Sequence, residues 1–100
     1  MSLEVVTTPE ADAQIVTIDE WWRANRLAAP NLFHEELGHC FAVLAEAPNI
    51  GKRYRRHRSV PDTRRVLLRA TRYHVYYVPF SDVLLVLAVW HSQRGQDPTL

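Results

Sequence analysis

The sequence predicts an α+β fold: an N-terminal strand, an antiparallel helical hairpin and then a three-stranded antiparallel sheet, all in one domain over residues 1–100. Three observations predict this class. In the first half, apolar residues recur every three or four positions, which is typical of helices that pack on one face. In the second half, they form short runs rich in Val, Leu and Tyr, which is typical of strands. A chain of 100 residues has the size of one domain with one core.

The first half predicts one strand and two helices. Residues 3–7 are apolar and branched, as a strand would be, and Pro9 suits the first turn of a helix capped by Thr7 or Thr8. This helix should end near Leu27, and its apolar stripe is formed by Ala11, Ile15, Ile18 and Trp22. After Pro30 a second helix begins, whose stripe is formed by Phe33, Leu37, Cys40 and Leu44. The short link between the helices predicts an antiparallel hairpin.

The second half predicts a basic loop over residues 52–62 and then three strands. Residues 63–70 and 73–78 are joined by a tight link and should form a β-hairpin. Residues 83–90 are apolar on both faces, which predicts a strand inside the sheet rather than at its edge. The tail after residue 90 has no helical pattern and should leave the sheet as an irregular segment.

Alternation along residues 63–70 indicates where the arginines of this strand should lie. Arg65 and Arg69 share one face with Leu67, while Val66 and Leu68 share the other. Because the helical hairpin should cover only one face of the sheet, we expect the arginines on the uncovered face.

Charge is strongly segregated along the chain. Residues 1–51 hold two basic and eight acidic side chains, whereas residues 52–72 hold nine basic and one acidic, a net charge of +8. Such a block is often only a solvated surface, but next to strands it favours an anion-binding face. The longest apolar run, residues 83–90, is too short to cross a bilayer, and the single Cys40 fits a reducing cytoplasm. We expect a cytoplasmic protein with no membrane partner.

The stretch HEELGH, residues 34–39, looks like the zinc motif H-E-x-x-H but differs in spacing. In that motif two histidines four residues apart share one helical face. His34 and His39 are five apart, which places them about 140° apart around a helix instead of about 40°. A shared metal would need a frayed helix or a third histidine from elsewhere, namely His57, His74 or His91. We therefore expect no metal site.

Four stretches together resemble the RelE/ParE toxins of bacterial type II toxin-antitoxin modules. They are VVTTPEADAQIVTIDEWW, LAEAPNIGKRY, RRVLLRATRYHVYYV and VLLVLAVWHSQRG, and they cover nearly the whole chain. The resemblance, closer to ParE, implies the fold predicted above, a cytoplasmic location and no cofactor. It also implies a cognate antitoxin that inactivates the toxin through an acidic C-terminal segment.

The superfamily contains two activities. ParE-like members inhibit DNA gyrase, and RelE-like members cleave messenger RNA on the ribosome. Cleavage through the 2′-OH needs a base, an acid and cations for the phosphorane, and a RelE-like site would comprise Arg65, His74, His91 and Arg94. The lysines of RelE-like enzymes are missing here, and Leu67 stands at one of their likely positions. The C-terminal tyrosine that such enzymes often have is also missing, because no tyrosine follows Trp90. We expect a gyrase inhibitor, with a ribosome-dependent nuclease as the first alternative and a non-toxic protein-binding module as the second.

The resemblance and the charge pattern together give the candidate residues for binding the target or the antitoxin. These are Arg64, Arg65, Arg69, Arg72, Trp21, His91 and Arg94. Trp22 continues the apolar stripe and should be core, whereas Trp21 should be a partly exposed contact. An ordinary role for His91 is also open, because a histidine at a strand end often only bonds to a neighbouring carbonyl.

Overall fold

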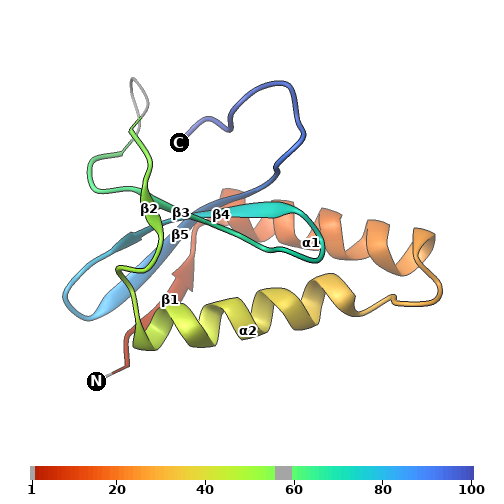
Figure 1. The fold of residues 1–100 in the computed structure, drawn as a ribbon, viewed down its shortest axis with the longest axis horizontal. Helices are drawn as coiled ribbons and strands as arrows, with labels where there is room; N and C mark the ends of the chain where they lie inside the picture. The colour runs from red at the N-terminus through yellow and green to blue at the C-terminus, as the bar shows by residue number, and fades with distance from the viewer. Residues whose placement is uncertain (1, 56–59) are drawn as a thin grey trace.

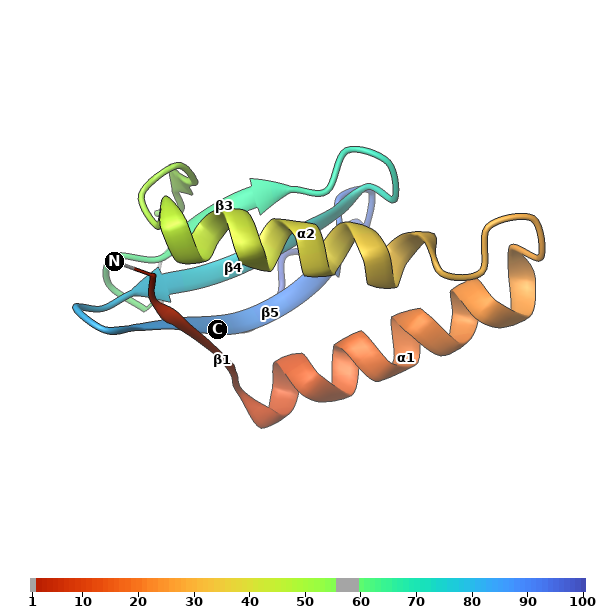
Figure 2. The same cartoon turned by 90° about the horizontal axis from the view of Figure 1, so that it is seen from below.

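A computed structural model describes residues 2–55 and 60–100 and places a helical hairpin against one face of a sheet (Figures 1 and 2). In chain order the elements are β1 (Glu4–Thr7), α1 (Pro9–Asn25), α2 (Leu32–Glu46), β2 (Lys52–Arg53), β3 (Arg64–Leu67), β4 (Tyr73–Pro79) and β5 (Val83–His91). The α+β class is therefore confirmed. Part of the predicted basic loop, residues 56–59 with His57, lies outside the described residues.

The helices form where the sequence predicts them. The Thr8 hydroxyl accepts a hydrogen bond from the Ala11 N–H at 3.1 Å, which caps the start of α1, and Pro9 occupies the first turn. α1 ends at Asn25, two residues before the predicted end, where the Arg26 N–H still bonds to the Trp22 carbonyl. Figure 2 shows α1 and α2 running in opposite directions along the same side of the sheet. Within the described residues, no helix is long and apolar enough to cross a bilayer.

The sheet contains the three predicted antiparallel strands, the predicted N-terminal strand β1 and one strand that was not predicted, β2. Its order is β1-β5-β4-β3-β2, with β1 parallel to β5 and all other neighbours antiparallel. β5 therefore lies inside the sheet, as predicted. The short β2 forms inside the segment that the sequence predicts as a loop, because it pairs with β3 through Lys52↔Arg65 and Arg53↔Arg64.

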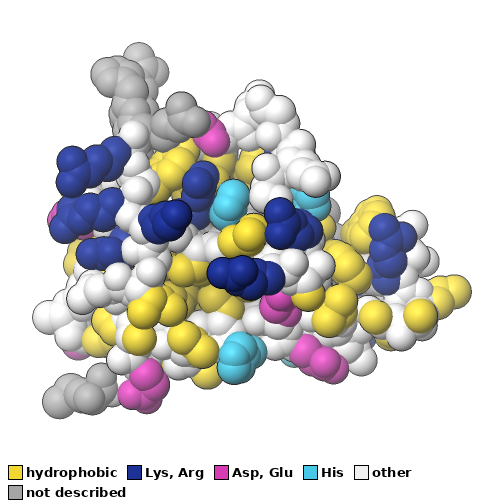
Figure 3. Space-filling view, viewed as in Figure 1, with side chains coloured by type: hydrophobic (Ala, Val, Ile, Leu, Met, Phe, Trp, Pro, Cys, Tyr) yellow, Lys and Arg dark blue, Asp and Glu magenta, His cyan; other side chains and the backbone are white. Residues whose placement is uncertain are grey.

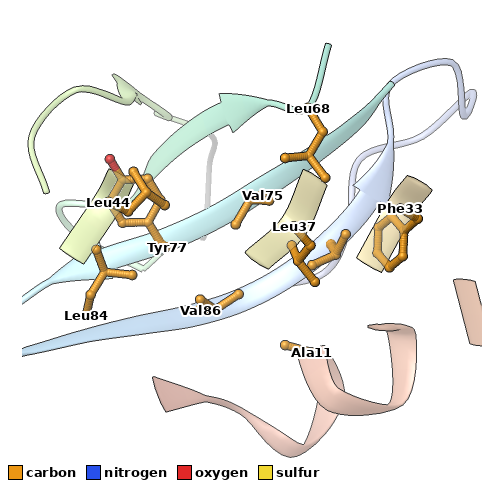
Figure 4. Close-up of a cluster of buried hydrophobic side chains, with 10 residues drawn as sticks. Ala11, Phe33, Leu37, Leu44, Leu68, Val75, Tyr77, Leu84 and Val86 are labelled. Carbon is orange, nitrogen blue, oxygen red and sulfur yellow. The ribbon is translucent and has the colours of Figure 1, made fainter. Parts of the chain in front are cut away.

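The main core lies between the helices and the sheet. The buried side chains drawn in Figure 4 come from both helices, from β4 and β5, and from Leu68 just after β3, and they point toward one another between the two layers. The helix stripes contribute Ala11, Phe33, Leu37 and Leu44 to it, as predicted. Cys40 packs at the margin of this cluster, and burial, followed by the nearby Glu36 carboxylate, raises the pKa of its thiol to about 11.

The face of the sheet that was predicted to be uncovered carries a second apolar cluster. Tyr54, Tyr76 and Ala88 are buried there, with Trp90 and Leu100 packed against them. The segment after β5 folds back over this face, and the Trp90 indole N–H donates to the Gln96 carbonyl at 2.8 Å. The prediction of a free face is therefore wrong, because the irregular tail supplies apolar side chains that cover part of it.

Candidate functional site

A groove of about 710 Å³ runs between α2 and β3, and we call it the α2–β3 groove. β2 pairs with β3 only at Arg64 and Arg65, so from Val66 onward the outer edge of β3 has no strand beside it in the described part of the chain. The cations that line the groove are Lys52, Arg65 and Arg69. An exposed strand edge next to positive charge is suited to an extended, acidic peptide.

Arg64 supports the start of β2. Its guanidinium donates to the carbonyls of Asn49 and Gly51, at 3.1 and 2.8 Å. The Tyr77 hydroxyl holds the same segment, since it accepts from the Gly51 N–H at 3.0 Å and donates to the Pro48 carbonyl at 2.8 Å. The structure therefore gives Arg64 an internal contact, and its part in binding remains a prediction.

Arg65 and His74 both line the α2–β3 groove and lie on the second face of the sheet, where Arg65 supplies the predicted positive charge. The Arg65 guanidinium lies over the rings of Tyr54 and Tyr76, with centroids at 5.4 and 5.8 Å. Burial lowers the pKa of His74 below its ordinary value of 6.5, and the positive charges of Arg65 and Arg72 lower it further. His74 is therefore neutral at physiological pH.

The turn after β3 presents two exposed arginines, Arg69 and Arg72. The Glu36 carboxylate of α2 fixes this turn, because it accepts from the Ala70 N–H at 2.7 Å, the Thr71 N–H at 3.0 Å and the Thr71 hydroxyl at 2.6 Å. Arg72 has a φ of 71°, so the chain reverses there and β3 ends at Leu67, before the predicted end. Figure 3 shows Lys and Arg gathered over β2, β3 and this turn, and acidic side chains along α2.

A second hollow of about 880 Å³ lies between α1 and the end of β5, and we call it the α1–β5 pocket. Three of the predicted binding residues line it: Trp21, His91 and Arg94. The His91 ring meets the Tyr73 ring edge-on at 4.9 Å, and its Nδ1 accepts from the Gln93 N–H at 3.1 Å. The Arg94 guanidinium lies over the Trp90 ring, 4.0 Å from its centroid.

The structure does not bring the predicted catalytic histidines together. Tyr73 pairs with His91 and packs against the main core, so His91 lies on the helix side of the sheet. The next residue, His74, lies beside Tyr76 of the second cluster, on the opposite side. The residues predicted for RNA cleavage are thus divided between the groove (Arg65, His74) and the pocket (His91, Arg94).

His34 and His39 are both exposed on α2, and only His39 lines the α2–β3 groove. No group of three or more His, Cys, Asp or Glu side chains that could hold a metal ion is found among residues 2–55 and 60–100.

Comparison with known proteins identifies the family. Residues 5–95 match the family described as the ParE toxin of the type II toxin-antitoxin system, parDE. The chain belongs to the ParE toxin family. A solved structure titled "Chromosomal ParDE TA system from P. aeruginosa" is similar to this ParE-family chain, with a TM-score of 0.67, 16% sequence identity, and coverage of 92% of this chain and 98% of that one. At this identity the likeness supports the fold. No curated protein matches the chain.

Sequence reasoning missed two site residues of this ParE-family toxin. Arg26 lines the α1–β5 pocket together with Trp22. The sequence could have indicated this, because the two residues are four apart and residues at that spacing share a helical face. Glu36 gave no such signal, because its partners Ala70 and Thr71 are 34 and 35 residues away in sequence.

Proposed function

We propose that this ParE-family toxin acts in the cytoplasm by binding DNA gyrase and inhibiting it, and that a cognate antitoxin neutralises it. The observation that carries the choice of an inhibitor is the placement of His74 and His91 on opposite faces of the sheet. An inhibitor needs only a binding surface, whereas RNA cleavage needs an acid and a base at the same phosphodiester.

The contacts of the arginines support the same choice. Arg65 lies over Tyr54 and Tyr76, and Arg94 lies over Trp90, so both guanidiniums rest on aromatic rings of the second apolar cluster, while Arg65 lines the α2–β3 groove and Arg94 lines the α1–β5 pocket. Arginine also holds its proton too firmly to serve as a base. A ribosome-dependent nuclease is thus the weaker alternative, and a non-toxic protein-binding module is the third.

Two assays run together test this proposal. The purified toxin should inhibit gyrase supercoiling, and its induction in cells should cause filamentation and DNA damage signalling while translation continues at first. His91→Ala should weaken inhibition only modestly, whereas a nuclease that used His91 as acid or base would lose about a hundredfold or more. Codon-specific cleavage of messenger RNA on programmed ribosomes, with gyrase unaffected, would replace the inhibitor by the nuclease. Inactivity in both assays would favour the binding module.

For the antitoxin, we infer that an acidic segment binds along the α2–β3 groove. The open edge of β3 offers backbone hydrogen bonds to an extended chain, and Lys52, Arg65 and Arg69 offer the complementary charge. Val43 and Ile50 also line the groove and are 37% and 57% exposed, so apolar side chains of the same segment could cover them.

Charge reversal tests this placement. Arg69→Glu and Arg65→Glu should each weaken antitoxin binding by about tenfold, with a loss that shrinks at high salt. Arg23→Glu makes the same change of charge on α1, outside the groove, and is the matched control. Isothermal titration with the product of the neighbouring antitoxin gene measures the effect. If the double variant of Arg65 and Arg69 binds as tightly as the parent, the antitoxin lies elsewhere.

A further inference from the structure

The α1–β5 pocket is free of carboxylates although it is built on an acidic helix. α1 carries Glu10, Asp12, Asp19 and Glu20, yet none of them is among the residues that line the pocket. The charged side chains that do line it are Arg26 from the end of α1 and Arg94 from the segment after β5. The pocket is therefore a local positive site on the acidic half of the molecule.

Its two arginines are not neutralised by the described residues. The ion pairs found among the described residues are Arg23–Asp19 and Arg53–Asp62, and neither includes Arg26 or Arg94. Arg26 instead lies over the Trp21 ring at 4.9 Å, as Arg94 does over Trp90. Guanidiniums held on aromatic rings keep their N–H donors for an anion.

Part of the remaining wall of the pocket is a series of aromatic rings in contact with one another. Trp21 meets Trp22 edge-on at 5.8 Å, and the Trp22 indole N–H donates to the Tyr73 hydroxyl at 3.4 Å. Tyr73 in turn meets His91 edge-on. Trp21 stays 45% exposed, which leaves ring surface for a planar ligand.

Three further hydrogen bonds suit the binding of an anion. The carbonyls at the end of α1 would repel negative charge, but Asn25 Nδ2 donates to the Trp21 carbonyl at 2.8 Å and the Arg26 N–H to the Trp22 carbonyl at 2.9 Å. Because His91 Nδ1 accepts from the Gln93 N–H, the neutral ring carries its proton on Nε2 as a donor.

We propose that the α1–β5 pocket binds a nucleoside phosphate, with the base among the aromatic rings and the phosphate on Arg26 and Arg94. The volume of about 880 Å³ lies in the range of small-molecule sites. Stacking of a base on aromatic side chains and a pair of arginines for phosphate are the contacts such a ligand needs. An acidic peptide would match the charge but leave the ring surface unused. The inference does not depend on gyrase inhibition and is tested by binding alone.

The test uses adenosine monophosphate and the purified full-length chain. Isothermal titration should show one site, with adenosine and inorganic phosphate each binding at least about tenfold more weakly, because each lacks half of the contacts. Arg26→Gln, Arg94→Gln and Trp21→Leu should each weaken binding by about fivefold or more. Arg23→Gln, which changes an arginine on the same helix outside the pocket, should leave it unchanged.

Amide chemical shifts locate the site, and a competition experiment distinguishes a free nucleotide from the 5′-phosphate end of a nucleic-acid strand. The shifts that move with adenosine monophosphate should belong to residues of the α1–β5 pocket. If a short single-stranded oligonucleotide with a 5′-phosphate competes for the site, a strand end is the natural ligand; if it does not, a free nucleotide is. Shifts confined to the α2–β3 groove, equal binding of phosphate alone, or an equal loss in Arg23→Gln would each overturn the proposal.

Discussion

At the scale of single residues, Tyr77 shows how one buried hydroxyl positions part of the binding surface. It is fully buried, and its hydroxyl bridges the Gly51 N–H and the Pro48 carbonyl, just before β2. A Cβ at position 51 would stand 2.5 Å from this hydroxyl oxygen, so the close approach requires glycine. The position of Lys52, the next residue and a cation of the α2–β3 groove, thus depends on a contact inside the core.

Tyr77→Phe should lower the free energy of unfolding by about 1–3 kcal/mol, because it leaves the buried Gly51 N–H without a partner. Urea unfolding followed by circular dichroism measures the change. Tyr73→Phe is the matched control, since the Tyr73 hydroxyl has one long bond, at 3.4 Å from the Trp22 indole nitrogen, and its loss should cost less than about 1 kcal/mol. Equal losses in the two variants would contradict this account.

Sequence patterns predicted buried residues better than polar contacts. Helical spacing identified Phe33, Leu37 and Leu44 as core, because a stripe on one helix face depends only on local periodicity. Arg64 was predicted to bind a partner, yet it donates to carbonyls 13 and 15 residues away in sequence. Contacts of this kind depend on how the elements pack, and no local pattern encodes them.

At the scale of elements, Glu36 is the link between α2 and the turn that ends β3. Its carboxylate accepts three hydrogen bonds from Ala70 and Thr71, and Thr71 is only 3% exposed. This link fixes the turn that carries Arg72 and Arg69, of which Arg69 lines the groove. Stability and the geometry of the binding surface therefore share one side chain.

Glu36→Ala should lower the free energy of unfolding by about 2–3 kcal/mol, because the two N–H groups and the hydroxyl lose a charged acceptor. Glu35→Ala removes the same charge from the neighbouring, exposed position in the first turn of α2 and should cost less than about 1 kcal/mol. The same urea titration compares them. If the two variants are equally stable, the contact with the turn contributes little.

Strand ends were the least predictable part of the fold. Lys52 and Arg53 have no apolar alternation, and they form β2 only because β3 lies beside them. β3 stops at Leu67 because Glu36 and the positive φ of Arg72 turn the chain, and neither is visible in the run of residues 63–70. By contrast, β5 was placed inside the sheet from its residues alone, since burial on both faces leaves a continuous apolar run.

At the scale of the whole molecule, two partly buried titratable groups limit the pH range in which the fold is most stable: His74 at low pH and Cys40 at high pH. The pKa of His74 lies below 6.5 in the folded state, because of burial and of the charges of Arg65 and Arg72. Below pH 6.5 the unfolded chain therefore takes up a proton that the fold resists, and stability falls as the pH is lowered. The pKa of Cys40 is raised from 9.0 to about 11, so above pH 9 the unfolded chain loses a proton that the folded chain keeps, and stability falls as the pH rises.

The melting temperature should therefore be highest between about pH 6.5 and 9.0 and decline on both sides. Differential scanning calorimetry across this range tests it with three variants. Cys40→Ala should flatten the decline between pH 9 and 10, a window that lies below the raised pKa of Tyr77, whose ordinary value is 10.0. His74→Gln should reduce the decline below pH 6.5, whereas His39→Gln, an exposed histidine on α2, should not. An alkaline decline of unchanged slope in Cys40→Ala would show that the buried thiol does not control it.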